Sequence, residues 1–326
     1  MENVLEKRNE IDRQIRELYQ QRMALDQEMT GTRSGNLRQI LEEAIGNTEK
    51  SFPEYATVAC QGVEGAYSEA AARKLFQYPG IMFFKSFDNI FSAIENGLCE
   101  YGILPIENST VGSVNKTYDL MCDHQFYIVR SIRLKIDHNL MVKPGTKEAD
   151  IREICSHQQA FDQCEKNLRA RFPKAKLIVC ANTAEAAKRV ADSQTNDRAA
   201  ICSPRCAALY ELQTLEDEIQ DNNHNYTRFI CIAKRPAIFA GADKTSFMAI
   251  LANKPGSLYG VLKKFNDIGY NLIKLESRPI PDTEFQFMFY FDFEASVYHK
   301  DFIDVMCQLE EECERMEYLG SYSEKI

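Results

Sequence analysis

The sequence of 326 residues has no apolar stretch long enough to cross a membrane or to form the core of a secretion signal. Its first residues are charged, and their pattern predicts a helix. We therefore expect a soluble protein of the cytoplasm that has no membrane partner. The length is typical of roughly two to three domains.

Paired cysteines and clustered histidines are also missing. The eleven cysteines include no Cys-x-x-Cys pair. Their odd number and scattered positions predict reduced, buried thiols rather than a disulfide framework. The five histidines have no spacing that would place two of them on one helical face. The sequence therefore predicts no metal site.

Positive charge is scarce. Lys and Arg total 39 against 48 Asp and Glu, the formal net charge is −9, and basic residues form no run. Because nucleic-acid binding needs a basic patch, we expect no nucleic-acid partner. Small anionic ligands are not excluded, since they respond to local charge. The hydrophobic fraction of 44% is ample for packed cores.

Residues 1–50 are polar and helical in pattern. Apolar side chains of the first helix fall three and four positions apart, yet Arg8 and Arg22 share their stripe. Two explanations of this stripe are open. It belongs either to a coiled coil with two irregular positions or to the remnant of an anion-binding fold. A second, short helix is predicted over residues 36–47.

Residues 55–233 alternate between strands and helices. Strands are predicted at 56–60, 81–84, 101–107, 126–132, 135–142, 176–180, 198–202 and 227–233, and helices at 68–76, 89–97, 149–155, 161–172 and 184–192. This alternation predicts an α/β fold with a largely parallel sheet, and the number of strands favours two lobes. Residues 244–322 follow the order β-α-β-β-α-β of a ferredoxin-like domain.

Polar and glycine-rich motifs mark candidate binding residues. Gly62-x-x-Gly65-x-x-Ser68 links a strand to a helix, as an anion-binding loop or as a simple structural turn. Glu107, Asn108 and Ser109 follow the end of a strand, where α/β folds bind ligands, although a helix N-cap is the alternative for such residues.

Two later motifs add further candidates. Ser156 is a natural helix N-cap, and Gln159 and Gln163 share one helical face. In NYTRF, Thr227 and Arg228 stand at the start of a buried strand. The guanidinium of Arg228 matches a carboxylate bidentately, and a surface salt bridge explains it equally well.

Together these motifs resemble one enzyme family. QGVEGAYSEAA, ILPIENSTVGSV, IDHNLM, SHQQAFDQC, NTAEAAK and NYTRF, in this order, resemble prephenate dehydratase. NKPGSLYGVL and NLIKLESRP resemble the ACT regulatory domain of those enzymes. The resemblance covers about residues 55–322. This chain departs from the family at Gln158, where the family usually has proline. The change leaves the neighbouring polar groups in place.

The resemblance implies a two-lobed, periplasmic-binding-protein-like catalytic domain (55–233) followed by an ACT domain (244–322). The implied reaction converts prephenate into phenylpyruvate, water and carbon dioxide without a cofactor. Thr227 would act at the leaving hydroxyl as a hydrogen-bond donor or relay. The other implied catalytic and substrate-binding residues are Glu107, Asn108, Ser109, Ser156, Gln159, Gln163, Thr183, Arg228, Gly65 and Ser68.

The resemblance also implies feedback control by L-phenylalanine and a homodimer or homotetramer. The effector would bind at Gly256, Ser257, Leu258, Asn271, Glu276, Ser277 and Arg278. A purely dimerising domain, a preference for arogenate and a non-catalytic amino-acid-binding regulator are the alternatives.

Residues 1–50 resemble a shortened AroQ-type chorismate mutase domain. Arg22 matches one of its chorismate-binding arginines and Arg33 a basic residue near the helix end, while Arg8 lies one turn out of place. The third helix of such a domain has no counterpart before residue 55. We therefore expect a vestigial segment with weak or absent mutase activity, and a bifunctional enzyme is the alternative.

Overall fold

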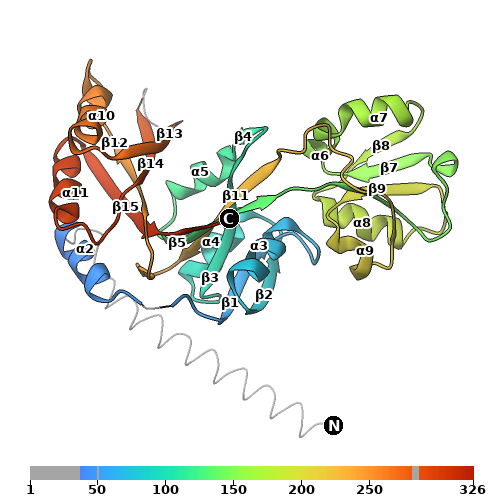
Figure 1. The fold of residues 1–326 in the computed structure, drawn as a ribbon, viewed down its shortest axis with the longest axis horizontal. Helices are drawn as coiled ribbons and strands as arrows, with labels where there is room; N and C mark the ends of the chain where they lie inside the picture. Colours follow the sequence, from blue (N-terminus) through green and yellow to red (C-terminus); the bar gives the residue numbers. More distant parts are fainter. Residues whose placement is uncertain (1–36, 50, 281–285) are drawn as a thin grey trace, which may run out of the picture.

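The computed structural model describes residues 37–49, 51–280 and 286–326. Three sheets follow one another along an elongated molecule (Figure 1). The predicted first helix, with Arg8, Arg22 and Arg33, lies outside the described residues. In the described ranges no helix is both long and apolar enough to cross a membrane.

The central sheet has seven strands in the order β16-β5-β11-β3-β1-β2, with β4 paired to β3. Strands β1, β2 and β3 are parallel, whereas β11 runs antiparallel between β3 and β5. The elements of this first lobe are β1 (Tyr55–Gln61), α3 (Tyr67–Leu75), β2 (Tyr78–Phe84), α4 (Phe87–Glu95), β3 (Tyr101–Asn108), β4 (Gly112–Ser113), α5 (Asn115–Met121), β5 (Tyr127–Lys135), β11 (Tyr226–Ala233) and β16 (Glu324–Lys325).

The second lobe has a five-stranded sheet in the order β10-β6-β9-β7-β8. Its elements are β6 (Asn139–Val142), β7 (Glu153–Ser156), α6 (Gln158–Gln163), α7 (Glu165–Arg171), β8 (Lys176–Val179), α8 (Thr183–Ala191), β9 (Arg198–Cys202), α9 (Arg205–Leu209) and β10 (Gln213–Glu216). The chain crosses between the lobes after β5 and again before β11. The two crossing segments are joined by a hydrogen bond from the N–H of Ile136 to the carbonyl of Asn225 (2.8 Å).

Two predictions for the second lobe were wrong, and one strand was missed. The helix expected over 149–155 is a single 3₁₀ turn (Glu148–Asp150) followed by strand β7. β7 is held between β8 and β9, so sheet pairing overrides a short apolar run whose spacing also suits a helix. The strand expected over 135–142 divides at the crossing between the lobes, and β10 was not predicted.

The C-terminal sheet has the order β13-β14-β12-β15, the ferredoxin-like arrangement predicted for residues 244–322. Its elements are β12 (Lys244–Ile250), α10 (Ser257–Ile268), β13 (Asn271–Pro279), β14 (Phe287–Glu294), α11 (Phe302–Glu311) and β15 (Arg315–Tyr322). Helices α10 and α11 cover one face, together with α2 (Leu37–Gly46), which packs against α11. The predicted α/β fold with a βαββαβ domain is thus confirmed. The sheets of the two lobes are not largely parallel as predicted, because each contains antiparallel as well as parallel pairs.

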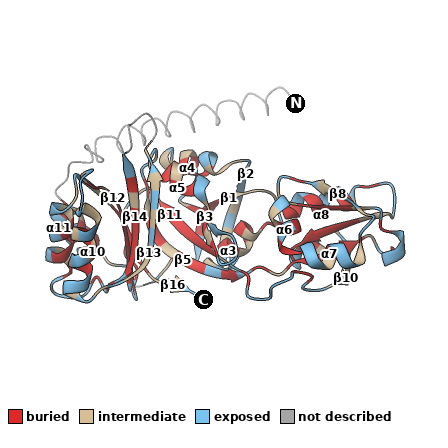
Figure 2. Ribbon diagram, turned by 90° about the horizontal axis from the view of Figure 1, so that it is seen from above, coloured by how far each residue is buried: buried red, intermediate tan, exposed pale blue. Residues whose placement is uncertain are grey.

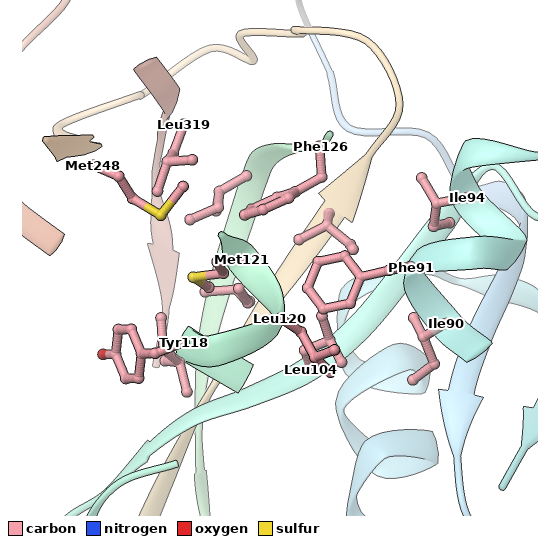
Figure 3. Packing of buried hydrophobic residues seen from close by; sticks show 14 of the residues in the cluster. Ile90, Phe91, Ile94, Leu104, Tyr118, Leu120, Met121, Phe126, Met248 and Leu319 are labelled. Atoms are coloured by element: carbon pink, nitrogen blue, oxygen red, sulfur yellow. The ribbon is translucent and has the colours of Figure 1, made fainter. Parts of the chain in front are cut away.

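The other face of the C-terminal sheet packs on the central lobe. Figure 3 shows this shared core, in which Met248 of β12 and Leu319 of β15 approach Met121 of α5 and Phe126. Since both of its faces are covered, β12 is buried along nearly its whole length (Figure 2). The C-terminal domain and the central lobe therefore share one buried hydrophobic cluster, which fixes their relative position.

Candidate active site

A cavity of about 430 Å³ lies between the two lobes, a size that suits a small-molecule ligand. It is bordered by the carboxyl ends of β1 and β3, by the first residues of β11, and by the N-terminal ends of α3, α6 and α8. The lining residues are Gln61, Ala66, Tyr67, Ser68, Phe87, Pro105, Asn108, Val114, Ile136, His138, His157, Gln159, Ala160, Gln163, Ala181, Asn182, Thr183, Thr227 and Phe229.

The wall of this cavity combines apolar side chains with uncharged polar groups. Among the described residues that line it there is no Asp, Glu, Lys or Arg. Its polar groups are amides, hydroxyls and two imidazoles. Burial lowers the pKa of His138 below its ordinary value, more than the hydrogen bond with Gln163 raises it, so this imidazole is neutral near pH 7. Such a wall can bind carboxylates through neutral donors.

Asn108 and Thr227 face each other across neighbouring strands at the cavity wall. They are register partners in the antiparallel pair of β3 and β11, and Asn108 Nδ2 lies 3.0 Å from Thr227 Oγ1. The Asn108 Oδ1 accepts the backbone N–H groups of Thr110 and Val111, at 3.0 Å each. Because the amide nitrogen can only donate, the Thr227 oxygen accepts this bond and its own proton stays available for a ligand.

Several predicted residues line the cavity together. Ser68, Gln159, Gln163 and Thr183 lie in its wall with Asn108 and Thr227. Ser68 donates its hydroxyl proton to the carbonyl of Gln61 (2.7 Å), which ties the start of α3 to the end of β1. Their placement fits the predicted binding roles, which stay predictions.

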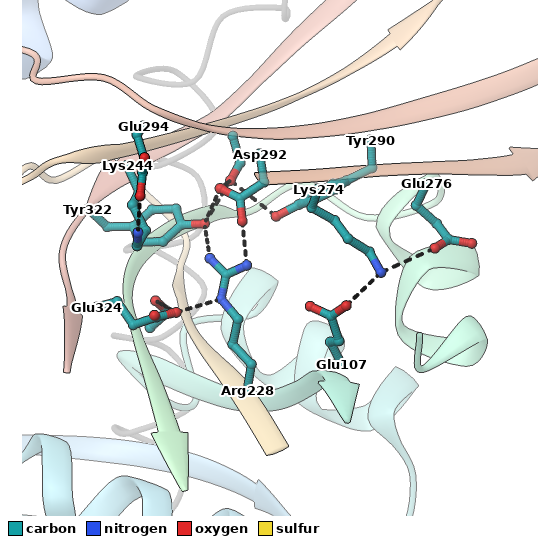
Figure 4. Close-up of polar contacts among 12 residues, drawn as sticks. Glu107, Arg228, Lys244, Lys274, Glu276, Tyr290, Asp292, Glu294, Tyr322 and Glu324 are labelled. Atoms are coloured by element: carbon teal, nitrogen blue, oxygen red, sulfur yellow. Dashed lines mark hydrogen bonds and ion pairs between the residues drawn. The ribbon is translucent and has the colours of Figure 1, made fainter. Parts of the chain in front are cut away.

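Glu107 and Arg228 were expected at the substrate and point elsewhere. Each neighbours a cavity residue on a strand, and successive side chains of a strand face opposite sides. The Glu107 carboxylate pairs with Lys274 Nζ of the C-terminal domain (2.9 Å), and Arg228 pairs with Asp292 and with Glu324 (2.8 Å) (Figure 4). Both side chains therefore contact residues other than those lining the cavity.

Ser109, Ser156 and Gly65 are also absent from the cavity wall in the described structure. Ser109 Oγ donates to the carbonyl of His224 (3.0 Å), and Ser156 Oγ donates to the carbonyl of Ile201 (2.7 Å). Gly65 has a φ of +94°, and a Cβ there would lie 3.0 Å from a neighbouring sulfur. The hydroxyls of Ser109 and Ser156 are thus bonded to backbone carbonyls. The N-cap of α6 is His157, not Ser156.

Sequence reasoning missed several lining residues. His138 and Asn182 lie within IDHNLM and NTAEAAK, stretches that carried the resemblance without any assigned role. His138 lies in a crossing segment between the lobes, so only the three-dimensional arrangement brings it to the cavity. Asn182 accepts the N–H of Glu185 as the N-cap of α8 (2.8 Å), which is the local signal that could have placed it.

The predicted effector residues divide into two groups. Gly256, Ser257 and Leu258 begin α10, and the buried Ser257 Oγ has no hydrogen-bond partner among the described residues. Asn271 donates to Glu294 (2.9 Å), and Ser277 is exposed. The other group contacts the central lobe: Glu276 accepts from Ser113, and Arg278 donates to Asp119 (2.8 Å). The side chains of Glu276 and Arg278 are thus engaged with residues of the central lobe.

Comparison with known proteins identifies relatives of this chain. Residues 58–237 match the family model of prephenate dehydratase. The chain is 38% identical to arogenate dehydratase 2 of Petunia hybrida over 284 residues, covering 81% of this chain and 71% of that protein. It is 35% identical to the bifunctional chorismate mutase/prephenate dehydratase of Pseudomonas aeruginosa, covering 82% and 73%.

A solved structure of a prephenate dehydratase also resembles this chain. The prephenate dehydratase of Arthrobacter aurescens, in complex with L-Phe, superposes with a TM-score of 0.75 at 29% identity, over 82% of this chain and 89% of that one. The two-lobed fold, the cavity between the lobes and these similarities together show that the chain belongs to the prephenate dehydratase family.

Proposed function

We propose that this protein converts prephenate into phenylpyruvate, carbon dioxide and water. The observation that carries the proposal is the uncharged cavity into which the Thr227 hydroxyl can donate. Prephenate brings two carboxylates and a ring hydroxyl. Neutral donors such as Gln159 and Thr183 would hold the carboxylates in a fixed pose.

The chemistry explains why the wall is uncharged. The electron pair of the bond to the ring carboxylate moves into the ring, carbon dioxide leaves, and the ring hydroxyl departs as water after it gains a proton. Negative charge leaves the carboxylate in the transition state, so a cation clamped on it would stabilise the substrate more than the transition state. Thr227 is too weak an acid to be the proton source, and we assign it as the hydrogen-bond donor at the leaving oxygen.

Turnover assays with the purified protein test this proposal. We expect phenylpyruvate from prephenate, measured by its absorbance in alkali. Arogenate is the second substrate to assay, because the Petunia relative is named for it. A higher kcat/KM for arogenate would make the protein an arogenate dehydratase, and no product from either substrate would contradict dehydratase function altogether.

We propose three parts for the chain, namely a mutase-like segment (1–50), a catalytic domain (55–233) and an ACT domain (244–322). The Pseudomonas relative is named as bifunctional. The packing of Leu37, Leu41 and Ala44 in the core of the C-terminal domain supports a structural role for α2. Arg22 and Arg33 lie outside the described residues, and we propose that they are vestigial. When chorismate is supplied as the substrate, we expect the purified protein to convert little or none of it.

The C-terminal domain is proposed to bind L-phenylalanine as a feedback effector, in a homodimer or homotetramer. Gly256 has a φ of +92° and precedes the first turn of the twelve-residue helix α10, whose N-terminus favours a carboxylate. The partnerless Ser257 hydroxyl next to it could bind the same ligand. The L-Phe complex of the Arthrobacter relative supports the choice of effector.

Isothermal titration with L-phenylalanine is expected to give saturable heat. Gly256→Ala should weaken binding, because alanine resists a positive φ and would move the turn. Gly269→Ala, at the other end of α10 with a φ of +73°, is the matched control and should bind normally. No heat at millimolar ligand, or equal loss in both variants, would refute an effector site at this turn.

A further inference from the structure

The direction of one buried hydrogen-bond network is set by backbone chemistry. The N–H groups of Thr110 and Val111 can only donate, so the Asn108 side-chain atom that faces them is the oxygen. The Asn108 amide nitrogen therefore faces Thr227 Oγ1 (3.0 Å) and Asn225 Oδ1 (2.8 Å). The two N–H groups of this nitrogen are shared among these oxygens and the carbonyl oxygen of Tyr226 (3.2 Å). Because an amide nitrogen cannot accept a hydrogen bond, each of the three oxygens can only accept from it.

The same reasoning extends to the second lobe. Because its oxygen faces Asn108, Asn225 presents its amide nitrogen to Gln163 Oε1 at 3.2 Å. That oxygen also lies 2.7 Å from His138 Nε2, so Nε2 carries the imidazole proton. Asn108, Asn225, Gln163 and His138 are all buried, and in such surroundings a reversed bond would leave two acceptors facing each other.

The remaining nitrogen of His138 keeps its lone pair. Nδ1 lies 3.5 Å from Tyr67 Oη, whose single proton is donated to the carbonyl of Asp137 (2.6 Å). The chain of bonds thus runs from a crossing segment, through Gln163 of α6 in the second lobe, to Asn108 and Thr227 in the first. It is complete only when the two lobes stand as they do here.

We propose that His138, Gln163 and Asn225 are positioning residues for Thr227, acting through a directed hydrogen-bond chain that holds the Thr227 oxygen as an acceptor and frees its proton for the substrate. The inference rests on the role of Thr227 at the leaving hydroxyl. Asn225 is not among the described residues that line the cavity, so any effect of changing it must pass through its neighbours.

Asn225→Asp tests the chain with almost no change in shape. The aspartate still accepts from Asn108, but it opposes the Gln163 oxygen with a second acceptor. Gln163 must then turn, and the proton arrangement at His138 changes with it. We expect kcat to fall by about 10- to 100-fold with little change in KM, as for a misplaced catalytic group. Asn223→Asp, an exposed position in the same segment, adds the same charge and should leave kcat unchanged.

Nitrogen NMR of the full-length protein labelled in histidine gives a readout that a merely structural role would not move. We expect wild-type His138, identified by its loss in His138→Gln, to be neutral with the proton on Nε2. Asn225→Asp should move the proton to Nδ1 or protonate both nitrogens. A wild-type Nδ1–H tautomer would overturn the inference. The tautomer is read from the wild-type protein, and only the assignment of the signal requires His138→Gln to fold.

The kinetic outcomes separate the inference from the proposed function. Wild-type kcat in Asn225→Asp, together with an inactive Thr227→Ala, would overturn the chain alone. Wild-type turnover in Thr227→Ala would instead remove the role of Thr227 on which the chain depends. Loss of kcat in Asn225→Asp without any change at His138 would also count against the chain.

Discussion

Thr227→Ala is expected to lower kcat for prephenate by about 10²- to 10⁴-fold, the range for loss of a group that assists proton transfer. The Thr227 hydroxyl is the donor that the cavity offers to the leaving oxygen, and Asn108 already supplies the bond that this hydroxyl accepts. The fold should survive, because the pairing of β11 with β3 and β5 uses backbone groups. Circular dichroism and thermal melting check that point.

Two further substitutions at Thr227 separate the hydroxyl from the shape of the side chain. Thr227→Val keeps the size and the β-branch and should be as inactive as alanine. Thr227→Ser keeps the hydroxyl and should recover most of kcat. Equal activity of the valine and serine variants would show that the shape of the side chain matters and that its hydroxyl donates no hydrogen bond to the leaving oxygen.

The register of the sheet explains why the central pair of the site could be predicted. NYTRF and ILPIENS were recognised as separate motifs, and each places a polar side chain at a strand end. Antiparallel pairing of β3 with β11 then sets Thr227 opposite Asn108. Strand ends in α/β folds gather at the ligand, so this part of the site follows from the sequence.

The same strands explain the main errors. Glu107 precedes Asn108 and Arg228 follows Thr227, so alternation sends both away from the cavity. The sequence analysis treated all polar residues of each motif as one group and did not take this alternation of side chains into account. His138 was missed for another reason: it enters the site only because the chain crosses between the lobes at that point, and no local pattern marks such a crossing.

The faces of β3 and β11 that point away from the cavity support the C-terminal domain. Lys274 of β13 reaches Glu107, and Asp292 of β14 reaches Arg228. The residues that neighbour Asn108 and Thr227 on each strand are therefore the ones that contact the proposed effector domain. We therefore expect these ion pairs to contribute to the free energy of unfolding. Their loss should lower stability more than it lowers kcat.

Arg228→Leu is expected to destabilise the protein by about 3–5 kcal/mol, the cost of removing one partner from a buried ion pair. The side chains of Arg228, Asp292 and Glu324 are 8%, 0% and 4% exposed. Without the guanidinium, the buried Asp292 carboxylate loses its cation, and Glu324 keeps only the half-exposed Arg133. Arg228 Nη2 also donates to Tyr322 Oη (3.1 Å), so the substitution loosens β15 as well. Urea and thermal unfolding measure the loss, and kcat at low temperature should fall far less than in Thr227→Ala.

Arg133→Leu is the matched control for this prediction. Arg133 is the register partner of Arg228 on strand β5 and pairs with the same Glu324 (2.7 Å). Its side chain, however, is 49% exposed. Its loss should cost about 1 kcal/mol or less, because solvent screens the pair and Arg228 still neutralises the carboxylate. Adding Asp292→Leu to Arg228→Leu should recover part of the stability, since it removes a buried charge without a partner. If the Arg133 and Arg228 variants unfolded at the same urea concentration, burial of the ion pairs of Arg228 with Asp292 and Glu324 would not add to the stability of the protein.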